Sequence, residues 1–351
     1  MTPGFAPPDL QRVDDALSRY RDPVLAGMRN ALERPGVEHV RFMRYHLGFE
    51  DAEGKPAEST GGKMLRPALV LLACEAAGGD ASRAMPAAVA IELLHNFSLI
   101  HDDIEDASET RHGRTTLWKL IGVQQAINAG DGLFVIAQRT LVDLADAGVP
   151  PARVLAASRM LNDACIALCE GQYADINFER RDRISQNEYE AMIAGKTAAL
   201  IGASTGIGAI AGGADDATVA ALAMCGIRLG MAFQIQDDVL GIWGEASETG
   251  KSAADDIRAR KKSFPVVFTF DHLEGAALEK LERIYASPAP SDAAVADVLT
   301  LFDSVRARQA ATSMAEQWAT QAIESLRPLE LNPDRREEIE ALASFFVHRR
   351  S

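Results

Sequence analysis

Apolar residues recur every three or four positions along most of this 351-residue chain, which is the spacing of an amphipathic helix. No run of alternating β-branched residues bounded by turns appears, so a sheet is not expected. The clearest helical segments are residues 9–32, 84–104, 124–147, 151–178 and 218–242. The pattern predicts an all-α protein of about ten or more helices.

Glycine, proline and serine gather where the helical pattern breaks, at residues 49–62, 148–151, 212–216, 244–252 and 287–291. These stretches are polar, as connecting loops are. None is long enough, or different enough in composition, to mark a domain boundary. We therefore expect one domain over residues 1–351.

Composition narrows the class of protein. Apolar residues make up 47% of the chain and charged residues 25%, which is typical of a soluble globular protein. Fifty acidic residues against 36 basic ones give a net charge of −14. Such a surface repels phosphate backbones, so nucleic acid is not an expected partner. Convergent carboxylates could still hold a divalent cation.

Neither a membrane span nor a leader peptide is expected. The longest uncharged stretch, residues 197–214, consists of Gly, Ala, Ser and Thr with few large apolar residues, which favours a packed internal helix. No basic segment followed by an apolar run opens the chain. The cytoplasm is the expected location. The four cysteines lack the spacing of a disulfide framework or a complete zinc site, and buried thiols are expected at Cys165 and Cys169.

The first candidate site is the acidic run HDDIED at the end of an apolar helix. Asp102 and Asp106 stand four residues apart, so their carboxylates share a helix face. Like charges at that spacing destabilise a helix, and Mg²⁺, which takes oxygen ligands, is a natural counter-ion. A solvated acidic helix end is the alternative interpretation of this motif taken alone.

A second acidic pair makes a merely solvated helix end a weaker interpretation. Asp237 and Asp238 lie within the apolar segment MAFQIQDDVLGI, where two carboxylates are costly unless they find partners. The two acidic motifs could face each other in a helical bundle and hold metal ions between them. A carboxylate site loaded with Mg²⁺ indicates a ligand of high negative charge, most simply a diphosphate.

Basic residues supply the complementary half of a diphosphate site. Arginine offers a planar fork for phosphate oxygens, and lysine offers a point charge. The candidates lie beside glycines or at helix ends: Lys63, Arg66, Arg111, Arg114, Lys196, Lys251, Lys261 and Lys262.

Taken in order, the elements GGKMLRP, DDIED, RHGRTT, GKT and FQIQDD resemble those of the trans-prenyltransferases, the polyprenyl synthetase family of isoprenyl diphosphate synthases. The resemblance covers residues 61–265 clearly. It implies the all-α isoprenoid synthase (prenyltransferase) fold around a central cavity, and a homodimer. The ordered set is far more specific than any one element.

The resemblance also implies residue roles. Asp102, Asp103 and Asp106, with Asp237 and Asp238, would hold three Mg²⁺ ions on an allylic diphosphate such as dimethylallyl, geranyl or farnesyl diphosphate. The family residues that contact that diphosphate correspond to Arg111, Lys196, Lys251 and Lys261. Isopentenyl diphosphate would be bound by Lys63, Arg66 and His95. Thr197 and Gln234 match groups that line the site of the developing carbocation.

The implied reaction is head-to-tail condensation of isopentenyl diphosphate with the allylic diphosphate. Phe97 lies five residues before Asp102, where its ring would stop chain growth early, unless it is an ordinary core residue. We therefore expect geranylgeranyl diphosphate (C20), with farnesyl diphosphate (C15) second.

Two positions depart from the family pattern. Gly241 replaces the last aspartate of the second motif, and His112 replaces the second arginine of a usual pair. Asp255 and Asp256 could compensate for the first change, and Arg114, Arg349 or Arg350 for the second, so we expect catalysis to survive. A terpene cyclase of the same fold and a non-catalytic regulatory subunit are the alternative functions. The isopentenyl-binding set argues against the former, and the intact first motif against the latter.

Overall fold

The computed structural model describes residues 8–34, 37–57, 62–244, 254–287 and 289–349. Its first half forms the helices α1 (Leu10–Ala31), α2 (Glu38–His46), α3 (Leu65–Ala76), α4 (Ala81–Glu105), α5 (Leu117–Ile121), α6 (Val123–Val142) and α7 (Pro151–Phe178). The second half forms α8 (Gln186–Ile193), the π-helical turn η1 (Ala194–Ala198), α9 (Ala199–Gly212), α10 (Asp216–Trp243), α12 (Asp255–Arg258), α13 (Phe264–His272), α14 (Gly275–Ala286), α15 (Asp292–Ser304), α16 (Ala307–Leu326) and α17 (Pro333–His348). The all-α prediction is confirmed.

One small sheet departs from the helical expectation. β1 (Thr110–Arg111) pairs antiparallel with β2 (Arg114–Thr115). The two residues between them, His112 and Gly113, have φ of 51° and 74°, the left-handed values of a tight hairpin turn. The hairpin is too short for a period-2 pattern, which is why the hydrophobic pattern did not predict it.

α9 lies at the centre of the bundle, packed against α3, α4, α7 and α10. Every residue from Leu200 to Ala211 is buried. Close approach depends on small residues: a Cβ on Gly226 of α10 would lie 2.6 Å from the carbonyl oxygen of Ile201. The uncharged stretch is therefore an internal helix, as predicted.

Two segments are long and apolar enough to span a membrane, Gln186–Gly212 and Asp216–Trp243, with 78% and 50% of their apolar windows buried inside the protein. Burial of this kind is what core helices of soluble proteins show. These segments are therefore weak grounds for a membrane span.

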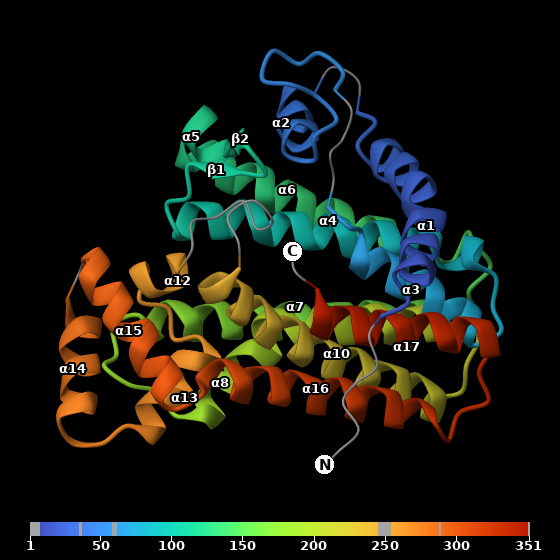
Figure 1. Ribbon diagram of the computed structural model, residues 1–351. Coiled ribbons are helices and arrows are strands. Elements are labelled where there is room, and N and C mark those ends of the chain that lie inside the picture. The colour runs from blue at the N-terminus through green and yellow to red at the C-terminus, as the bar shows by residue number, and fades with distance from the viewer. Residues whose placement is uncertain (1–7, 35–36, 58–61, 245–253, 288, 350–351) are drawn as a thin grey trace.

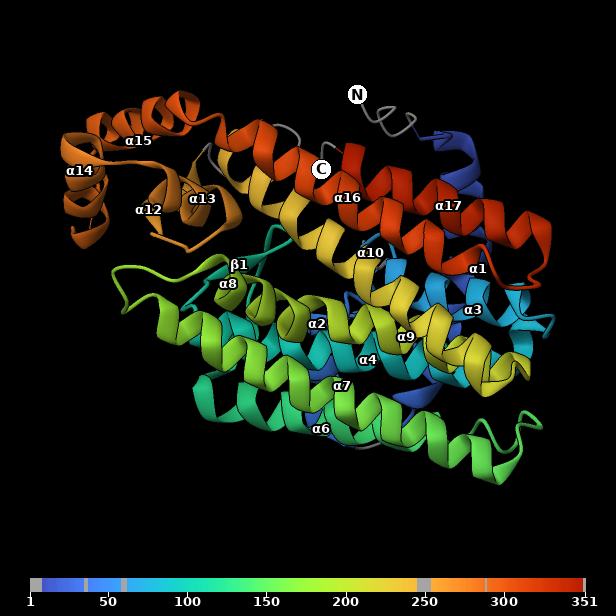
Figure 2. The ribbon, with the colours of Figure 1, turned by 90° about the horizontal axis from the view of Figure 1, so that it is seen from below.

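The long helices run alongside one another. Figure 2 shows α6, α7, α9, α10 and α16 side by side, and contacts join each to the next. α12, α13, α14 and α15 form a smaller group at one end with its own apolar cluster. The C-terminal end of α10 reaches this group, because α12 and α13 pack on α10. The second acidic motif therefore lies where the bundle meets the smaller group.

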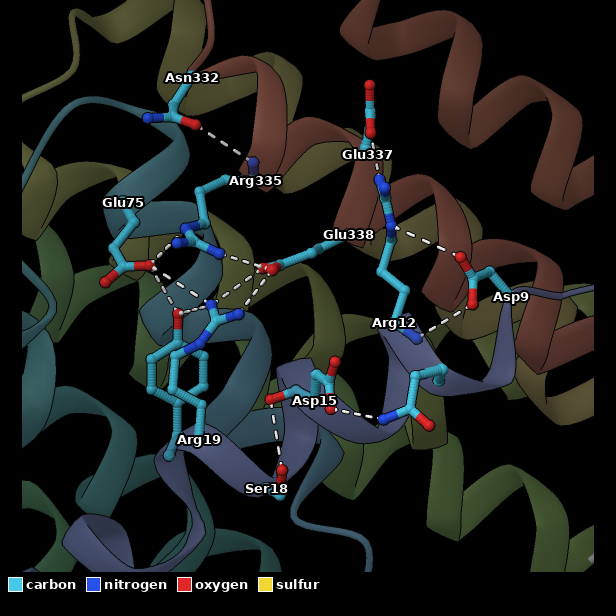
Figure 3. Close-up of polar contacts among 12 residues, drawn as sticks. Asp9, Arg12, Asp15, Ser18, Arg19, Glu75, Asn332, Arg335, Glu337 and Glu338 are labelled. Carbon is cyan, nitrogen blue, oxygen red and sulfur yellow. Dashed lines mark hydrogen bonds and ion pairs between the residues drawn. The ribbon is translucent and has the colours of Figure 1, made fainter.

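A network of ion pairs joins α1 to α17 (Figure 3). Glu338 accepts hydrogen bonds from Arg19 at 2.7 Å and from Arg335 at 2.6 Å. Arg335 also contacts Glu75 of α3 at 2.8 Å. Burial opposes ionisation of Glu338, but the hydrogen bonds from the two arginines outweigh it and lower its pKa. The network ties the two ends of the chain to the core.

The cysteine prediction was half wrong. Cys165 is buried, but Cys169, one turn later on α7, is exposed. The residues four apart do lie near one another, as the helix requires. The side of α7 that carries Cys169 simply faces outward.

Candidate active site

The first acidic motif forms the last turn of α4. Asp106 caps the helix, and its amide donates to the carbonyl oxygen of Asp102 at 2.8 Å. Burial raises the pKa of Asp102 to about 6, with a further rise from Asp106, while Lys196 opposes the shift. Asp102 and Asp106 therefore sit one turn apart, as the spacing predicted.

Asp103 is directed differently from its neighbours. It is 2% exposed, and Arg111 Nε donates to its Oδ1 at 2.8 Å. Burial raises the pKa of Asp103, and the charge of Arg111 opposes that rise. The pair fixes the β1–β2 hairpin against the end of α4, so Asp103 orients Arg111 within the site.

The second acidic motif lies near the end of α10, and its buried member is Asp238. Asp238 Oδ2 accepts hydrogen bonds from the Tyr189 hydroxyl at 2.6 Å and from the Phe264 amide at 2.8 Å. Gln234 Nε2 donates to Oδ1 at 3.1 Å. Burial raises the pKa of Asp238 to about 7 in spite of these donors.

Asp237 turns the other way, toward the C-terminal end of the chain. Its Oδ1 forms an ion pair with Arg349, whose guanidinium lies 3.8 Å from the centre of the Phe233 ring. The Arg349 side chain is 8% exposed, whereas that of Asp237 is 39% exposed. Asp237 is therefore the more accessible carboxylate of the second motif.

Lys196 lies on the π-helical turn η1, a local distortion that is frequent at functional sites. Its Nζ donates to Asp175 Oδ2 of α7 at 2.5 Å. The two elements approach closely because residue 171 of α7 is glycine: a Cβ there would lie 2.8 Å from Lys196 Cα. The next residue, Thr197, donates to Gln234 Oε1 at 2.6 Å, which links η1 to Asp238.

Lys261 connects the two acidic motifs. Its Nζ lies 4.0 Å from Asp256 Oδ1. Burial lowers the pKa of Lys261, but the charges of Asp256, Asp175, Asp106 and Asp238 together raise it. The basin is the region around Lys261, which lies within electrostatic range of carboxylates from both motifs. The neighbouring Lys262 is 5% exposed and lies over the Tyr285 ring, outside this set. Lys251 and Arg350 fall outside the described residues.

A cavity of about 110 Å³ lies beside the first motif and is lined by two arginines and three histidines. Next to it, Arg66 Nη1 lies 3.3 Å from His95 Nε2. Burial, together with the charges of Arg66 and Arg111, lowers the pKa of His95 well below its usual range. Burial lowers the pKa of the other two lining histidines, His46 and His112, as well, so the positive charge of the cavity comes from Arg111 and Arg114.

Arg114 is not available to replace the arginine that His112 displaces. Its two Nη groups donate to the backbone carbonyls of Tyr45 and Glu50, each at 2.7 Å. Arg349 is likewise engaged, because its guanidinium donates to the Phe233 carbonyl oxygen at 3.1 Å and to Asp237. Compensation for His112 by either arginine stays a prediction.

The donor chemistry suits a hard divalent cation, since the basin offers carboxylate oxygens from two helix ends. Among the described residues, no three His, Cys, Asp or Glu side chains already converge on one point. Mg²⁺ commonly binds through one or two carboxylates and completes its shell with water and substrate phosphate. The residues present therefore fit Mg²⁺ that arrives with a diphosphate.

Comparison with known proteins identifies the family. The polyprenyl synthetase family model matches residues 55–302. The chain belongs to the polyprenyl synthetase family. It is 38% identical to the (2E,6E)-farnesyl diphosphate synthase of Mycobacterium tuberculosis over 96% of each chain. A geranylgeranyl diphosphate synthase from the same organism is 41% identical over 82% of this chain and 80% of its own.

Solved structures of the family share the fold. The polyprenyl synthetase of Streptomyces coelicolor A3(2) superimposes with a TM-score of 0.88 at 39% identity, covering 95% of this chain and 99% of that chain. The geranylgeranyl pyrophosphate synthetase of Pyrococcus horikoshii Ot3 gives a TM-score of 0.86 at 32% identity, covering 97% and 99%. The predicted isoprenoid synthase fold is thereby confirmed for this polyprenyl synthetase.

The predicted chain-length residue, Phe97, is half-buried one turn above the acidic motif. Its ring packs edge-on against His101, with centroids 5.1 Å apart, and lies 5.3 Å from the ring of Phe134 on α6. α6 therefore supports Phe97 from behind. Its gating role stays a prediction.

Several residues of the site were not predicted from the polyprenyl synthetase motifs. They are Asp175, which holds Lys196; Tyr189, which holds Asp238; and His46, which lines the cationic cavity. Each lies outside the motif runs, and only packing brings it into the site. The sequence does not single out Asp175, because α7 carries other charged residues such as Asp163 and Glu170.

Proposed function

We propose that this polyprenyl synthetase is a Mg²⁺-dependent prenyltransferase that condenses isopentenyl diphosphate with an allylic diphosphate. The observation that carries the proposal is that each acidic motif stands beside a guanidinium, Asp103 beside Arg111 at 2.8 Å and Asp237 beside Arg349. Diphosphate needs both cationic side chains and carboxylate-held metal, and the basin offers the ligands for each. The names of the relatives, farnesyl and geranylgeranyl diphosphate synthase, support this substrate class.

The allylic diphosphate would lie between the acidic motifs. Asp102, Asp106 and Asp237 are the carboxylates best exposed to hold Mg²⁺, with Asp103 and Asp238 orienting their neighbours. When bound, Mg²⁺ would neutralise charge that develops on the leaving diphosphate. Arg111, Lys196 and Lys261 would contact the same diphosphate directly.

The chemistry then requires an anhydrous site. The allylic C–O bond breaks, and its electron pair leaves with the diphosphate. The double bond of isopentenyl diphosphate attacks the resulting cation, and a proton passes to the departed diphosphate. Thr197 and Gln234, hydrogen-bonded at 2.6 Å, would present oxygen dipoles beside the cation. Exclusion of water matters, because water would quench the cation.

Isopentenyl diphosphate would bind at the cavity beside the first motif. Arg66 and His95 are joined at 3.3 Å, and His112 lines the same cavity. Lys63 lies on the approach to Arg66, 5.0 Å from the Phe345 ring. Arg349 would add the second guanidinium that the replacement by His112 removes.

The product is proposed to be geranylgeranyl diphosphate, with farnesyl diphosphate the alternative. Phe97 and the supporting Phe134 form an aromatic pair next to the first motif, with ring centroids 5.3 Å apart. Relatives with both product names resemble this chain at similar identity, so only product analysis separates the two lengths.

We also propose a cytoplasmic homodimer formed through α6 and α7. Val135 and Val142 of α6 are 62% and 54% exposed. Leu155, Ile166 and Tyr173 of α7 are 64%, 58% and 73% exposed and share one helix face. The two helices lie next to each other (Figure 2), and a second copy would cover their exposed apolar residues. Light scattering of Leu155→Asp/Ile166→Asp should reveal a monomer; an unchanged dimer would exclude this surface.

One incubation tests the function. Purified protein, Mg²⁺ and labelled isopentenyl diphosphate are combined with C5, C10 or C15 allylic diphosphates, and products are separated by chain length. Label should appear in C20 or C15 diphosphate. A cyclic hydrocarbon without label would indicate a terpene cyclase. No product with any primer would overturn the proposal and favour a regulatory subunit.

A further inference from the structure

A second cavity, of about 410 Å³, lies where α10, α16 and the C-terminal end of α17 meet. Its lining and that of the cavity beside the first motif have no residue in common. Gln236 and Trp243, seven residues apart, share the face of α10 that lines it, while Arg308 comes from α16 and Arg349 follows α17. The volume is in the range of small-molecule sites, which is about 300–1,000 Å³.

The charge of the lining favours an anion. Two arginines contribute to it, but no aspartate or glutamate does, in a chain with 50 acidic residues. Arg349 is paired with Asp237, which lies outside the lining. Within the part of the chain that the structure describes, Arg308 forms no ion pair, and its guanidinium carbon lies 5.7 Å from the centre of the Trp243 ring. Arg308 therefore supplies a positive charge that no carboxylate balances.

Two buried polar atoms of the lining residues have no hydrogen-bond partner among the described residues. They are Oε1 of Gln236, an acceptor, and Nε of Arg349, a donor. Gln236 is 7% exposed, and its Nε2 already donates to the Arg349 carbonyl oxygen at 3.1 Å. The Arg349 side chain is 8% exposed. Because buried polar atoms are nearly always hydrogen-bonded, these two indicate a ligand that accepts from one and donates to the other.

We propose that this cavity binds a small anion that also carries a hydroxyl group. The anionic oxygens would accept from Arg308 and from Nε of Arg349, and the hydroxyl would donate to Oε1 of Gln236. A phosphate monoester and a carboxylate of a polyol share this chemistry. Apart from Arg349, no residue named here has a proposed role in binding either substrate diphosphate, so the site is additional to the prenyl-transfer machinery.

Isothermal titration calorimetry of the full chain at pH 8 tests this chemistry. Mg²⁺ and inorganic diphosphate are present in excess, to occupy the diphosphate sites. Glycerol 3-phosphate and glycerate carry both the charge and the hydroxyl. Their matched probes without a hydroxyl are methyl phosphate, whose second proton is lost at this pH, and propionate, while glycerol has no charge.

At least one hydroxylated anion should bind at one site per chain, and which one binds separates phosphate from carboxylate. Its matched probe should bind about tenfold more weakly, a typical loss when a buried acceptor is left without its hydrogen bond. Glycerol should not bind.

Three variants locate the site. Arg308→Gln should weaken binding about tenfold or more, because a hydrogen bond to a charged group is lost. Arg306→Gln makes the same change of charge at another exposed position, outside the cavity lining, and should bind like the wild type. Gln236→Met removes the acceptor, so the hydroxylated anion and its matched probe should bind equally. Thermal unfolding checks folding, and Arg308 is exposed, so its substitution leaves the core intact.

Failure of both hydroxylated anions to bind would overturn the inference, because the cavity would then hold only water. Equal weakening by Arg308→Gln and Arg306→Gln would also overturn it, since binding would then follow net charge alone. Equal affinity of the wild type for an anion with and without the hydroxyl would do the same. None of these results bears on the proposed function, which depends on whether the wild-type protein elongates an allylic diphosphate.

Discussion

The hydroxyl of Tyr189 donates a hydrogen bond of 2.6 Å to Oδ2 of Asp238, linking α8 to the acidic end of α10. Neither residue is exposed to any extent, with 0% and 7% accessibility. The bond favours the ionised form of Asp238 in a place where burial opposes ionisation. The position and charge of the second acidic motif therefore depend on a residue 49 positions earlier in the chain.

Tyr189→Phe should raise the pKa of Asp238 further, because a donor to its ionised form is lost. A hydrogen bond to a charged group contributes about 1.5–3 kcal/mol. The acid limb of the pH profile of prenyl transfer should shift to higher pH, with a smaller effect at pH 8.5 than at pH 6.5. An identical pH profile in the variant would show that this bond does not tune the site.

The titration of Asp238 should make the free energy of unfolding depend on pH. Its folded-state pKa of about 7 lies above the unfolded value of 3.8, so between these values the folded state binds more protons. The free energy of unfolding must then fall as pH rises through this window. At about 1.4 kcal/mol per pKa unit, the upper limit is on the order of 4 kcal/mol.

Asp238→Asn isolates this contribution, because an amide keeps an oxygen toward Tyr189 and Phe264 but does not titrate. Urea unfolding without Mg²⁺ at pH 5 and pH 8 should show a greater loss of stability in the wild type than in the variant. Parallel changes in the two proteins would contradict the assignment.

Lys196→Met should lower turnover on the order of 10²-fold, as removal of one preorganised charge-stabilising donor typically does. It also leaves Asp175 without its lysine. The double variant Lys196→Met/Asp175→Asn removes that unpaired carboxylate, so it should recover stability without recovering turnover. Recovery of turnover would mean that Lys196 acts only by neutralising Asp175.

Phe97→Ala should lengthen the product, because it removes the ring between the acidic motif and Phe134. Phe97→Tyr keeps a ring of similar size and should leave the chain length within one isoprene unit of the wild type. Product chains are separated by chromatography after incubation with labelled isopentenyl diphosphate. The same product from Phe97→Ala and wild type would make Phe97 an ordinary core residue.

The α1–α17 network offers a matched pair of stability variants. Glu338→Gln leaves Arg19 and Arg335 without a carboxylate that is only 10% exposed, and should cost about 1–3 kcal/mol. The neighbouring Glu337 is 56% exposed and paired with Arg12. Glu337→Gln should therefore lower the free energy of unfolding by only about 1 kcal/mol or less. Equal losses in urea unfolding would show that burial of the network contributes nothing.

The spacing of residues along the sequence determined much of the secondary structure of this protein. The 3.6-residue periodicity was enough to predict the helices, and the four-residue spacing of Asp102 and Asp106 was enough to place both on one helix end, because helix geometry depends only on neighbours in sequence. The ordered motifs likewise pointed to the family. These features need no knowledge of which helices meet.

Tertiary structure decided what each charged group does. Asp103 and Asp238 resemble their neighbours in sequence, yet packing directs one to Arg111 and the other to Tyr189, while Asp237 meets Arg349. The approach of Asp256 to Gly241 depends on how α12 docks on α10. Such partners come from elements that are distant in sequence, and so does the burial that raises a carboxylate pKa. Residue spacing alone therefore cannot predict them.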